Sequence, residues 1–347
     1  MVIKTKVNKT YNYILRLGIV FFTYGFIYKQ IFHKKDIYAL FSQLEKSVES
    51  SYFIILLIVV FTLMFVNWMV ESIKWRYLIL KIENISIIKS LEAVFTGISI
   101  SAFTPNRIGE YFGRVFILDR ANPWKAILVT IIGSMSQLLT TLILGSIGLL
   151  LFINTYKSFI INFFYINQQF FMWLYSGAII LTLFVDVFLL LLFLNVPVVT
   201  DYVNKLVKKR WRRIRSYISV LGEYQSRELL KVIMMSFTRY MIFTAQFYLL
   251  LRMFEVNIPY YHAMIIISMV YFVITVIPTV ALTELGIRGS VSIYFLGLYF
   301  DKFQTLNDAV KLGIVSASTG LWLINLAIPA LMGTIFVFRL KFFRKIS

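Results

Sequence analysis

Apolar runs long enough to cross a lipid bilayer recur along this chain of 347 residues. About twenty consecutive apolar residues, folded as a helix, span the hydrocarbon core. The backbone of such a run has to satisfy its own hydrogen bonds, which a helix does within a single segment. Hydrophobic residues make up 59% of the sequence and charged residues only 15%. We therefore expect an all-α polytopic membrane protein, with residues 1–347 forming a single integral membrane domain.

The basic residues indicate how the chain is oriented in the membrane. Six runs are expected to be full spans, at residues 11–28, 52–73, 126–153, 170–196, 230–251 and 312–338. The net charge is +19, and seven of the eleven residues in 205–215 are Lys or Arg. The positive-inside rule places that stretch and both termini in the cytoplasm, as expected for a cell-membrane protein. The other interpretation of 205–215 is a helix that lies on anionic lipid.

The composition also excludes several kinds of chemistry. The chain contains no cysteine, which excludes disulfides, thiolate catalysis and a Cys-ligated zinc site. Its two histidines, His33 and His262, are far apart, so a histidine metal site is not expected. No phosphate-binding loop of the G-x-x-x-x-G-K-[ST] type occurs. We expect no cofactor and no catalytic residues, and the basic clusters at the ends of apolar runs do not indicate nucleic-acid binding.

A motif at 103–118, FTPNRIGEYFGRVFIL, places charged residues, glycines and a proline inside the apolar chain. Charged residues at membrane depth are costly and usually mark a functional site. The basic residues before and after the motif place both of its ends on the cytoplasmic side. The apolar run that enters the motif is shorter than a full span. A re-entrant hairpin fits both observations.

A second motif at 277–290, IPTVALTELGIRGS, repeats this design about half a chain later. Its neighbouring spans predict a hairpin that enters from the outer face. The halves 52–155 and 230–338 would then form an inverted repeat, joined by a basic cytoplasmic loop at about 197–230, as in many secondary transporters. Hydropathy leaves open the alternative that the hairpin arms are full spans, which gives seven or eight crossings.

The first motif contains the features of an anion site. Thr104 is placed as an N-cap and Pro105 as the first helical residue, so we expect a helix to begin there with free N–H groups. Arg107, Glu110 and Arg114 follow at spacings of three and four, which sets them on one helix face. A positive helix end with two guanidinium groups is a plausible seat for phosphate. The alternative is a structural ion pair beside a packing seam.

Glycines in both motifs predict close approach of helices. Gly109 is followed by Gly113 in the first motif, and Gly286 by Gly289 in the second. The second motif adds a proline, a glutamate and an arginine, so its candidate substrate-binding residues are Pro278, Glu284, Gly286 and Arg288. Across both motifs three arginines face two glutamates, and this excess of positive charge favours an anionic substrate.

Two further charges lie within consecutive predicted spans. Asp186 and Arg239 are at similar depths when each is counted from the cytoplasmic end of its span. Opposite charges at one depth in neighbouring helices are expected to pair, because an isolated charge costs at least about 2.5–3.5 kcal/mol there. A proton or ion relay is the alternative role.

The motifs resemble those of a known family, the membrane region of lysylphosphatidylglycerol synthases and its stand-alone relatives. The resemblance rests on the P-x-x-I-G-E pattern that begins at Pro105, with Arg114 after it, and on the I-P-T and E-L-G-x-R patterns that end at Arg288. It implies a lipid flippase that moves an anionic or aminoacylated phospholipid, or a lipid-linked substrate, between leaflets. About nine residues follow the last predicted span, so we do not expect aminoacyl transfer or other enzyme activity.

Two functional classes remain open at this stage. The first is a lipid transporter whose partners are membrane phospholipids. The second is an accessory subunit or scaffold that presents a lipid carrier to a separate transferase. The sequence does not decide whether the chain forms a homo-oligomer.

Overall fold

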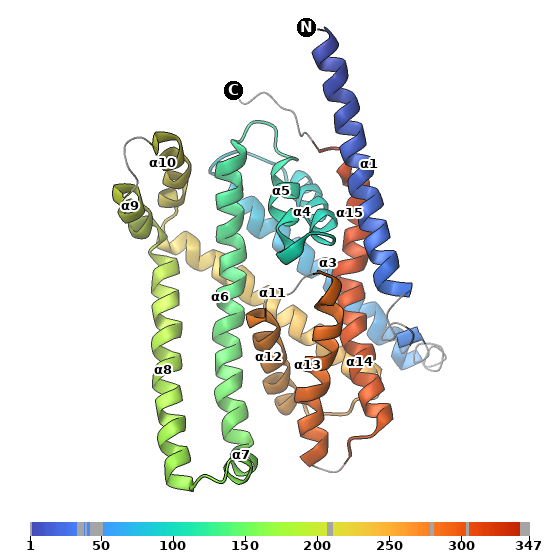
Figure 1. Cartoon of the computed structure of the whole chain (residues 1–347), viewed down its shortest axis with the longest axis vertical. Helices are drawn as coiled ribbons and strands as arrows, with labels where there is room; N and C mark the ends of the chain where they lie inside the picture. Colours follow the sequence, from blue (N-terminus) through green and yellow to red (C-terminus); the bar gives the residue numbers. More distant parts are fainter. Residues whose placement is uncertain are drawn as a thin grey trace.

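The computed structural model describes residues 2–32, 38, 40–41, 51–206, 211–277, 281–302 and 305–340. The regular elements within these ranges are all helical (Figure 1). In chain order they are α1 (Val2–Phe32), α3 (Ser51–Ile79), α4 (Ile87–Ser101), the 3₁₀ turn η1 (Pro105–Arg107), α5 (Gly109–Val115), α6 (Pro123–Thr155), α7 (Lys157–Phe163), α8 (Gln168–Leu194), α9 (Val196–Leu206), α10 (Arg212–Ile218), the 3₁₀ turn η3 (Ser219–Glu223), α11 (Ser226–Met253), α12 (Tyr260–Val276), α13 (Ala281–Lys302), α14 (Asp308–Trp322), the π-helical turn η4 (Leu323–Ala327) and α15 (Ile328–Val337).

Four helices are long and apolar enough, by length and composition, to cross a membrane. They are α3, α6, α8 and the continuous helix 308–337 formed by α14, η4 and α15. These four coincide with four of the six predicted spans. The other two predicted spans fall in α1 and α11, helices of 31 and 28 residues. The prediction of a helical membrane protein is confirmed at this level, whereas the number of spans stays a prediction.

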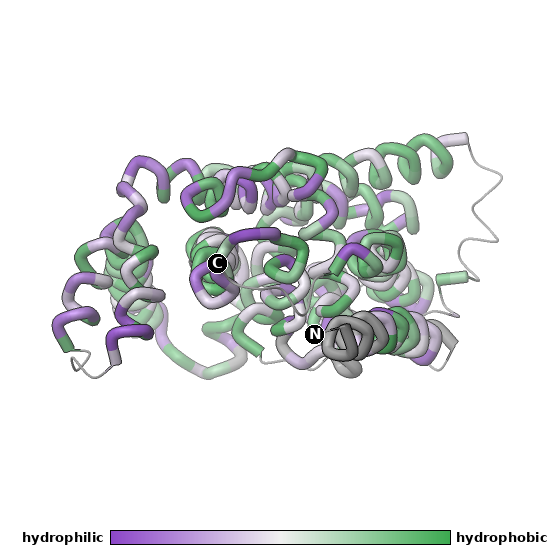
Figure 2. The backbone as a smooth tube through the Cα atoms, turned by 90° about the horizontal axis from the view of Figure 1, so that it is seen from above, coloured by the Kyte–Doolittle hydropathy of each residue, from purple (hydrophilic) through white to green (hydrophobic). Residues whose placement is uncertain are grey.

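The basic segment lies at one end of the molecule. The start of α1, together with α9 and α10, is at the upper end in Figure 1, and α7 is at the opposite end. Seen from above, the α9 and α10 region is rich in hydrophilic residues, drawn in purple in Figure 2. Residues 207–210, in the middle of the predicted basic stretch, lie outside the described residues. This end is the one expected to face the cytoplasm.

The first motif forms a tight helical hairpin of α4 and α5. Ser86 caps α4 by accepting a hydrogen bond from the N–H of Lys89. A Cβ atom added to Gly113 would lie 2.7 Å from the Cα of Gly97, so only glycine permits this approach of α5 to α4. Gly109 is equally tight, since its Cβ would lie 2.7 Å from the carbonyl oxygen of Ile100. The close approach expected in the first motif is therefore present.

A helix does begin at Pro105 with Thr104 as its N-cap, as expected, but it is a 3₁₀ turn and not an α-helix. The turn has three residues, and the α-helix starts at Gly109. Thr104 does cap this later start, because its Oγ1 accepts a hydrogen bond from the N–H of Gly109 at 2.9 Å. The sequence pattern of cap and proline does not show that the α-helix starts only at Gly109, because it gives no sign of the left-handed backbone of Arg107, whose φ is 57°.

A carboxylate clasp closes the base of this hairpin. Glu83, in the turn between α3 and α4, accepts hydrogen bonds from the backbone N–H groups of Asp119, Arg120 and Ala121 at 2.7–3.0 Å. Lys89 pairs with the same carboxylate at 2.8 Å. These contacts join the entry of the hairpin to its exit, so the position of α5 is fixed from outside the apolar region.

The second motif begins at Ile277, directly after α12, and its residues 281–290 lie in α13, while Pro278 lies outside the described residues. Both helices lie farther from the α9–α10 end than the α4–α5 hairpin does (Figure 1). The expected close approach at Gly286 and Gly289 is not present among the described residues, because an added Cβ at either position would have none of their atoms within 4 Å. The glycine spacing indicates where a helix can approach but not whether a partner lies there.

Candidate functional site

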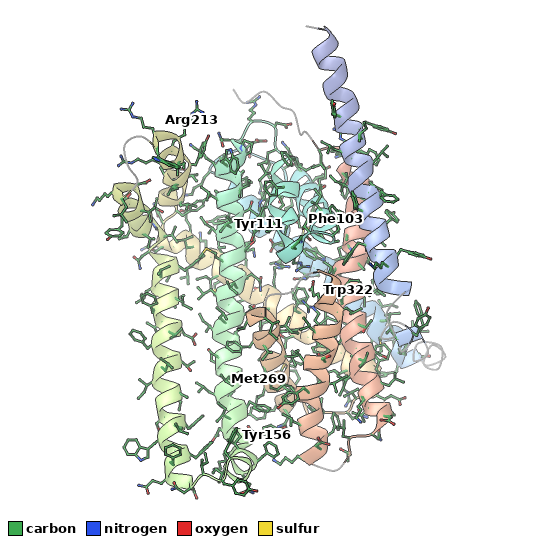
Figure 3. The ribbon with its side chains drawn as sticks, in the orientation of Figure 1. Phe103, Tyr111, Tyr156, Arg213, Met269 and Trp322 are labelled. Carbon is green, nitrogen blue, oxygen red and sulfur yellow. The ribbon has the colours of Figure 1, made fainter. Side chains whose placement is uncertain are left out.

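A cavity of about 360 Å³ lies where the two motifs meet. The side chains that line it come from α3, η1, α5, α6, α11, α12, α13, α14 and η4. Two of them, Tyr111 and Trp322, lie in the middle part of the molecule, between Arg213 at one end and Tyr156 at the other (Figure 3). The polar lining therefore sits between the ends of the apolar helices rather than at either surface.

Five of the residues singled out from the sequence line this cavity. They are Arg107, Glu110, Arg239, Glu284 and Arg288. The two motifs, about 175 residues apart in the sequence, therefore contribute side chains to one cavity. Two of the remaining candidates, Thr104 and Pro105, form the turn that leads into α5, and Gly109 packs α5 against α4.

Glu71, which lies outside both sequence motifs, is the centre of the charge network. Its side chain is 5% exposed. Arg114 donates to Oε1 at 2.7 Å, Lys74 lies 2.9 Å from Oε2, and Arg239 pairs with Oε2 as well. We call these four residues, Glu71, Lys74, Arg114 and Arg239, the Glu71 cluster. Three cations here share one carboxylate.

Lys74 directly follows the predicted span 52–73, which is the position typical of a cation at a membrane surface. It is instead 1% exposed and lines the cavity. Its ammonium group also donates to the carbonyl oxygen of Gly133 at 3.2 Å and to Oγ of Ser236 at 3.3 Å. The spacing of Asn67, Glu71 and Lys74, by four and then three residues, puts them on one face of α3 and is the signal that could have identified them.

Arg114 holds the two carboxylates of the first half in place. It is 2% exposed and pairs with Glu71 through Nη1 and with Glu110 through Nη2. It is not among the cavity-lining residues in the described part of the chain. Arg114 therefore positions Glu110, which does line the cavity, and its predicted direct contact with a substrate is not supported by this placement.

The predicted ion pair between Asp186 and Arg239 is wrong. Arg239 pairs with Glu71, donates from Nε to Oδ1 of Asn67 at 3.0 Å, and lies over the ring of Trp68 at 5.3 Å. Asp186, on α8, accepts a hydrogen bond from Oγ of Ser146 at 2.5 Å, and no ion pair of Asp186 occurs within the described ranges. Two residues at the same depth in neighbouring helices can still lie on helix faces that point away from each other.

Arg107 is the cavity arginine with a free guanidinium group. No hydrogen bond or ion pair joins its side chain to the rest of the described structure, and its Nε is buried without a partner. Its φ of 57° puts a non-glycine residue in the left-handed region, which costs on the order of 1–3 kcal/mol. A strained backbone that presents an unpaired cation to a cavity is the arrangement expected at a ligand site.

The second motif contributes one ion pair to the cavity. Arg288 lies one turn after Glu284 on α13, with Nη2 3.0 Å from Oε1. The Glu284 side chain is 9% exposed and that of Arg288 23%. Because Arg288 is the more exposed of the two, it can pair with Glu284 and still offer donors to a ligand.

The charges around the cavity do not balance. Four cations, Lys74, Arg107, Arg239 and Arg288, and three carboxylates, Glu71, Glu110 and Glu284, line the cavity. A fifth cation, Arg114, lies behind the lining in ion pairs with Glu71 and Glu110. The excess is two positive charges. In the ranges that the structure describes, no group of three or more His, Asp or Glu side chains is placed to hold a metal ion.

The family model of the lysylphosphatidylglycerol synthase TM region matches residues 13–306. The match covers most of the chain and both motifs, so the chain belongs to this family. No curated protein and no solved structure was found to match it.

Proposed function

We propose that this chain, a member of the lysylphosphatidylglycerol synthase TM-region family, is a lipid transporter that binds an anionic headgroup in the central cavity and moves it between leaflets. The observation that carries the proposal is the unpaired guanidinium of Arg107 within a cavity that has an excess of two positive charges. A lipid headgroup that enters the membrane loses its water, and this polar lining replaces the lost hydrogen bonds.

The two broken helical segments support an alternating-access mechanism. The α4–α5 hairpin lies toward one end of the molecule and α12–α13 toward the other (Figure 1). α4 has fifteen residues, or about 22 Å of helix, which is short of the roughly 30 Å hydrocarbon core. We infer that both are re-entrant hairpins of an inverted repeat and that the end with α9 and α10 faces the cytoplasm.

A transport assay tests the proposal. The purified protein is reconstituted in liposomes with a fluorescent anionic phospholipid in both leaflets, and quenching from outside reports exchange between leaflets. The quencher removes the fluorescence of the outer leaflet at once, and the fluorescence of the inner leaflet is lost only as lipid moves outward. We expect this second loss to be fast with the unaltered protein. Its rate should be at least about tenfold lower with Arg107→Gln, since one charge-assisted hydrogen bond is worth about 1.5–3 kcal/mol. Arg120→Gln is the matched control, because the Arg120 side chain is exposed and outside the cavity.

Two outcomes would contradict the proposal. Exchange no faster than in empty liposomes would favour the alternative, an accessory subunit that holds a lipid carrier for a separate transferase. Equal rates of lipid exchange for Arg107→Gln and Arg120→Gln would show that exchange does not depend on Arg107 and its cavity.

The orientation is tested separately by labelling single cysteines, which is practical because the chain has none of its own. A cysteine at Lys125, at the start of α6, is expected to react with an impermeant reagent only from the cytoplasmic side. A cysteine at Tyr261, at the start of α12, is expected to react only from the outside. Reaction of both from one side would overturn the inverted repeat.

A further inference from the structure

The charge balance of the cavity restricts the class of anion that it can hold. The Glu71 cluster is itself one carboxylate among three cations. Glu110 is paired with Arg114 and Glu284 with Arg288, and no carboxylate of the described residues lies within ion-pair distance of Arg107. An uncompensated charge in this setting costs at least about 2.5–3.5 kcal/mol. A ligand with a single negative charge would leave one of the two excess positive charges uncompensated.

Lipid phosphates come in two charge classes. A phosphodiester headgroup, with its phosphate bonded on both sides, carries one negative charge on that phosphate. A terminal phosphomonoester loses its second proton at about pH 6 and approaches a charge of −2 above it, with three acceptor oxygens. Only the second class balances an excess of two positive charges.

The donors in the cavity suit a phosphate with free oxygens. Arg107 and Arg288 come from opposite motifs, and both line the cavity, as does Arg239. The named contacts of Arg239 use Nε and Nη1, which leaves Nη2 without an assigned protein acceptor in the described structure. Guanidinium groups bind phosphate through paired N–H donors, and a terminal phosphate presents three oxygens to three arginines.

We propose that the preferred ligand of this cavity is the dianionic terminal phosphate of a lipid phosphomonoester. The inference rests on the proposed function, because it specifies the headgroup that the transporter takes. It separates this chain from a carrier of phosphodiester lipids or of lipids with an added ammonium group. An ammonium group would raise the excess positive charge instead of reducing it.

The proposal predicts how binding depends on pH. The charged groups that line the cavity are the three arginines above, Lys74 of α3, and the carboxylates Glu71, Glu110 and Glu284. Arg114 lies behind Glu71 and Glu110 and pairs with both, and Tyr111, Tyr240 and Tyr271 are the tyrosines of the lining. Each carboxylate is ion-paired in the structure, and no histidine is among the described residues that line the cavity. The titration near pH 6 therefore belongs to the ligand. Affinity for a phosphomonoester should fall as the pH drops through about 6, whereas affinity for a phosphodiester should stay level.

A binding experiment on the full chain in detergent tests this. Calorimetry compares short-chain phosphatidic acid, a phosphomonoester, with short-chain phosphatidylglycerol, a phosphodiester, and with inorganic phosphate. At pH 7.5 we expect phosphatidic acid to bind about ten- to a hundredfold more tightly than phosphatidylglycerol, because it makes one more charge-assisted hydrogen bond. At pH 5 the ratio should fall toward one.

Variants show whether the preference comes from the cavity. Arg107→Gln removes one excess charge and should reduce the ratio at pH 7.5 about tenfold, while Arg120→Gln should leave it unchanged. Equal or tighter binding of phosphatidylglycerol at pH 7.5 would overturn this inference and leave the proposed function standing. Absence of binding by both lipids would contradict the proposed function as well. Inorganic phosphate that binds as tightly as phosphatidic acid would show that the site recognises free phosphate and not a lipid.

Discussion

Removing the charge of Glu83 should loosen the α4–α5 hairpin without touching the cavity. The Glu83 carboxylate accepts three backbone N–H groups from residues 119–121 and pairs with Lys89. Burial alone would raise the pKa of Glu83, but Lys89 and the three N–H groups outweigh it and lower the pKa from 4.5 to about 2. The lowered pKa means that the folded protein stabilises the ionised carboxylate.

The size of the effect follows from that shift. A difference of about 2.5 pKa units corresponds to about 3 kcal/mol at 1.36 kcal/mol per unit. Since a neutral amide keeps one acceptor oxygen, we expect Glu83→Gln to lower the free energy of unfolding by about 2–3 kcal/mol at pH 7. Thermal unfolding in detergent, followed by intrinsic fluorescence, measures this loss. Glu223→Gln is the control, because the Glu223 side chain is exposed.

The pH dependence of stability independently checks that the pKa of Glu83 is lowered on folding. Because the folded pKa of Glu83 lies below the unfolded value, its stabilisation is fully present above about pH 4.5 and is lost as the pH falls toward 2. The difference in stability between the unaltered protein and Glu83→Gln should therefore be constant from pH 7 to about 5 and shrink from 4.5 to 3. Equal stability at pH 7, or a difference that does not shrink in acid, would refute this account of the clasp.

Three further substitutions test the packing and the charge network. Gly113→Ala should cost about 1–3 kcal/mol of stability, because its Cβ would lie 2.7 Å from the Cα of Gly97, while Gly177→Ala, with open space around it, should not destabilise the protein; thermal unfolding compares them. Glu71→Gln should cost about 3–5 kcal/mol or prevent folding, since it leaves three buried cations without their shared carboxylate, and yield and monodispersity in detergent report this. Asp186→Asn should change stability by less than about 1 kcal/mol, because an amide still accepts the hydrogen bond from Ser146; a loss of 3–5 kcal/mol would instead indicate a buried ion pair.

The sequence predicts the helical class and the location of the cavity well. Long apolar runs specify helices through the requirement for backbone hydrogen bonding, and rare charges within them mark polar surroundings. Arg107, Glu110, Glu284 and Arg288 were identified in this way, and the structure puts all four around one cavity. Their role in binding substrate stays a prediction.

The sequence does not predict the partners of those charges. Lys74 follows an apolar run and is followed by further basic residues, which is the pattern of a cation at a membrane surface, yet it is buried. The distinction depends on which helices pack against α3. The prediction that Asp186 pairs with Arg239 failed for the same reason. The sequence gives the depth of each residue along its helix but not which neighbouring helix its side chain faces. The motif glycines show the same limit. Gly109 and Gly113 of α5 have α4 at contact distance, whereas Gly286 and Gly289 of α13 have no described atom within 4 Å of an added Cβ.

Two carboxylates, Glu83 and Glu71, hold the α4–α5 hairpin in place through different contacts. Glu83 fixes the base of α4–α5 through backbone N–H groups, so its contribution does not depend on which side chains line the cavity. Glu71 joins Arg114 of α5 to Arg239 of α11 and therefore links the first half of the chain to the second. In the proposed transport cycle, an anion bound at Nη2 of Arg239 would draw that guanidinium from Glu71 and weaken the link between the halves, whereas the clasp at Glu83 would be unaffected. Ligand binding would then be coupled to the contact between the halves that alternating access has to change.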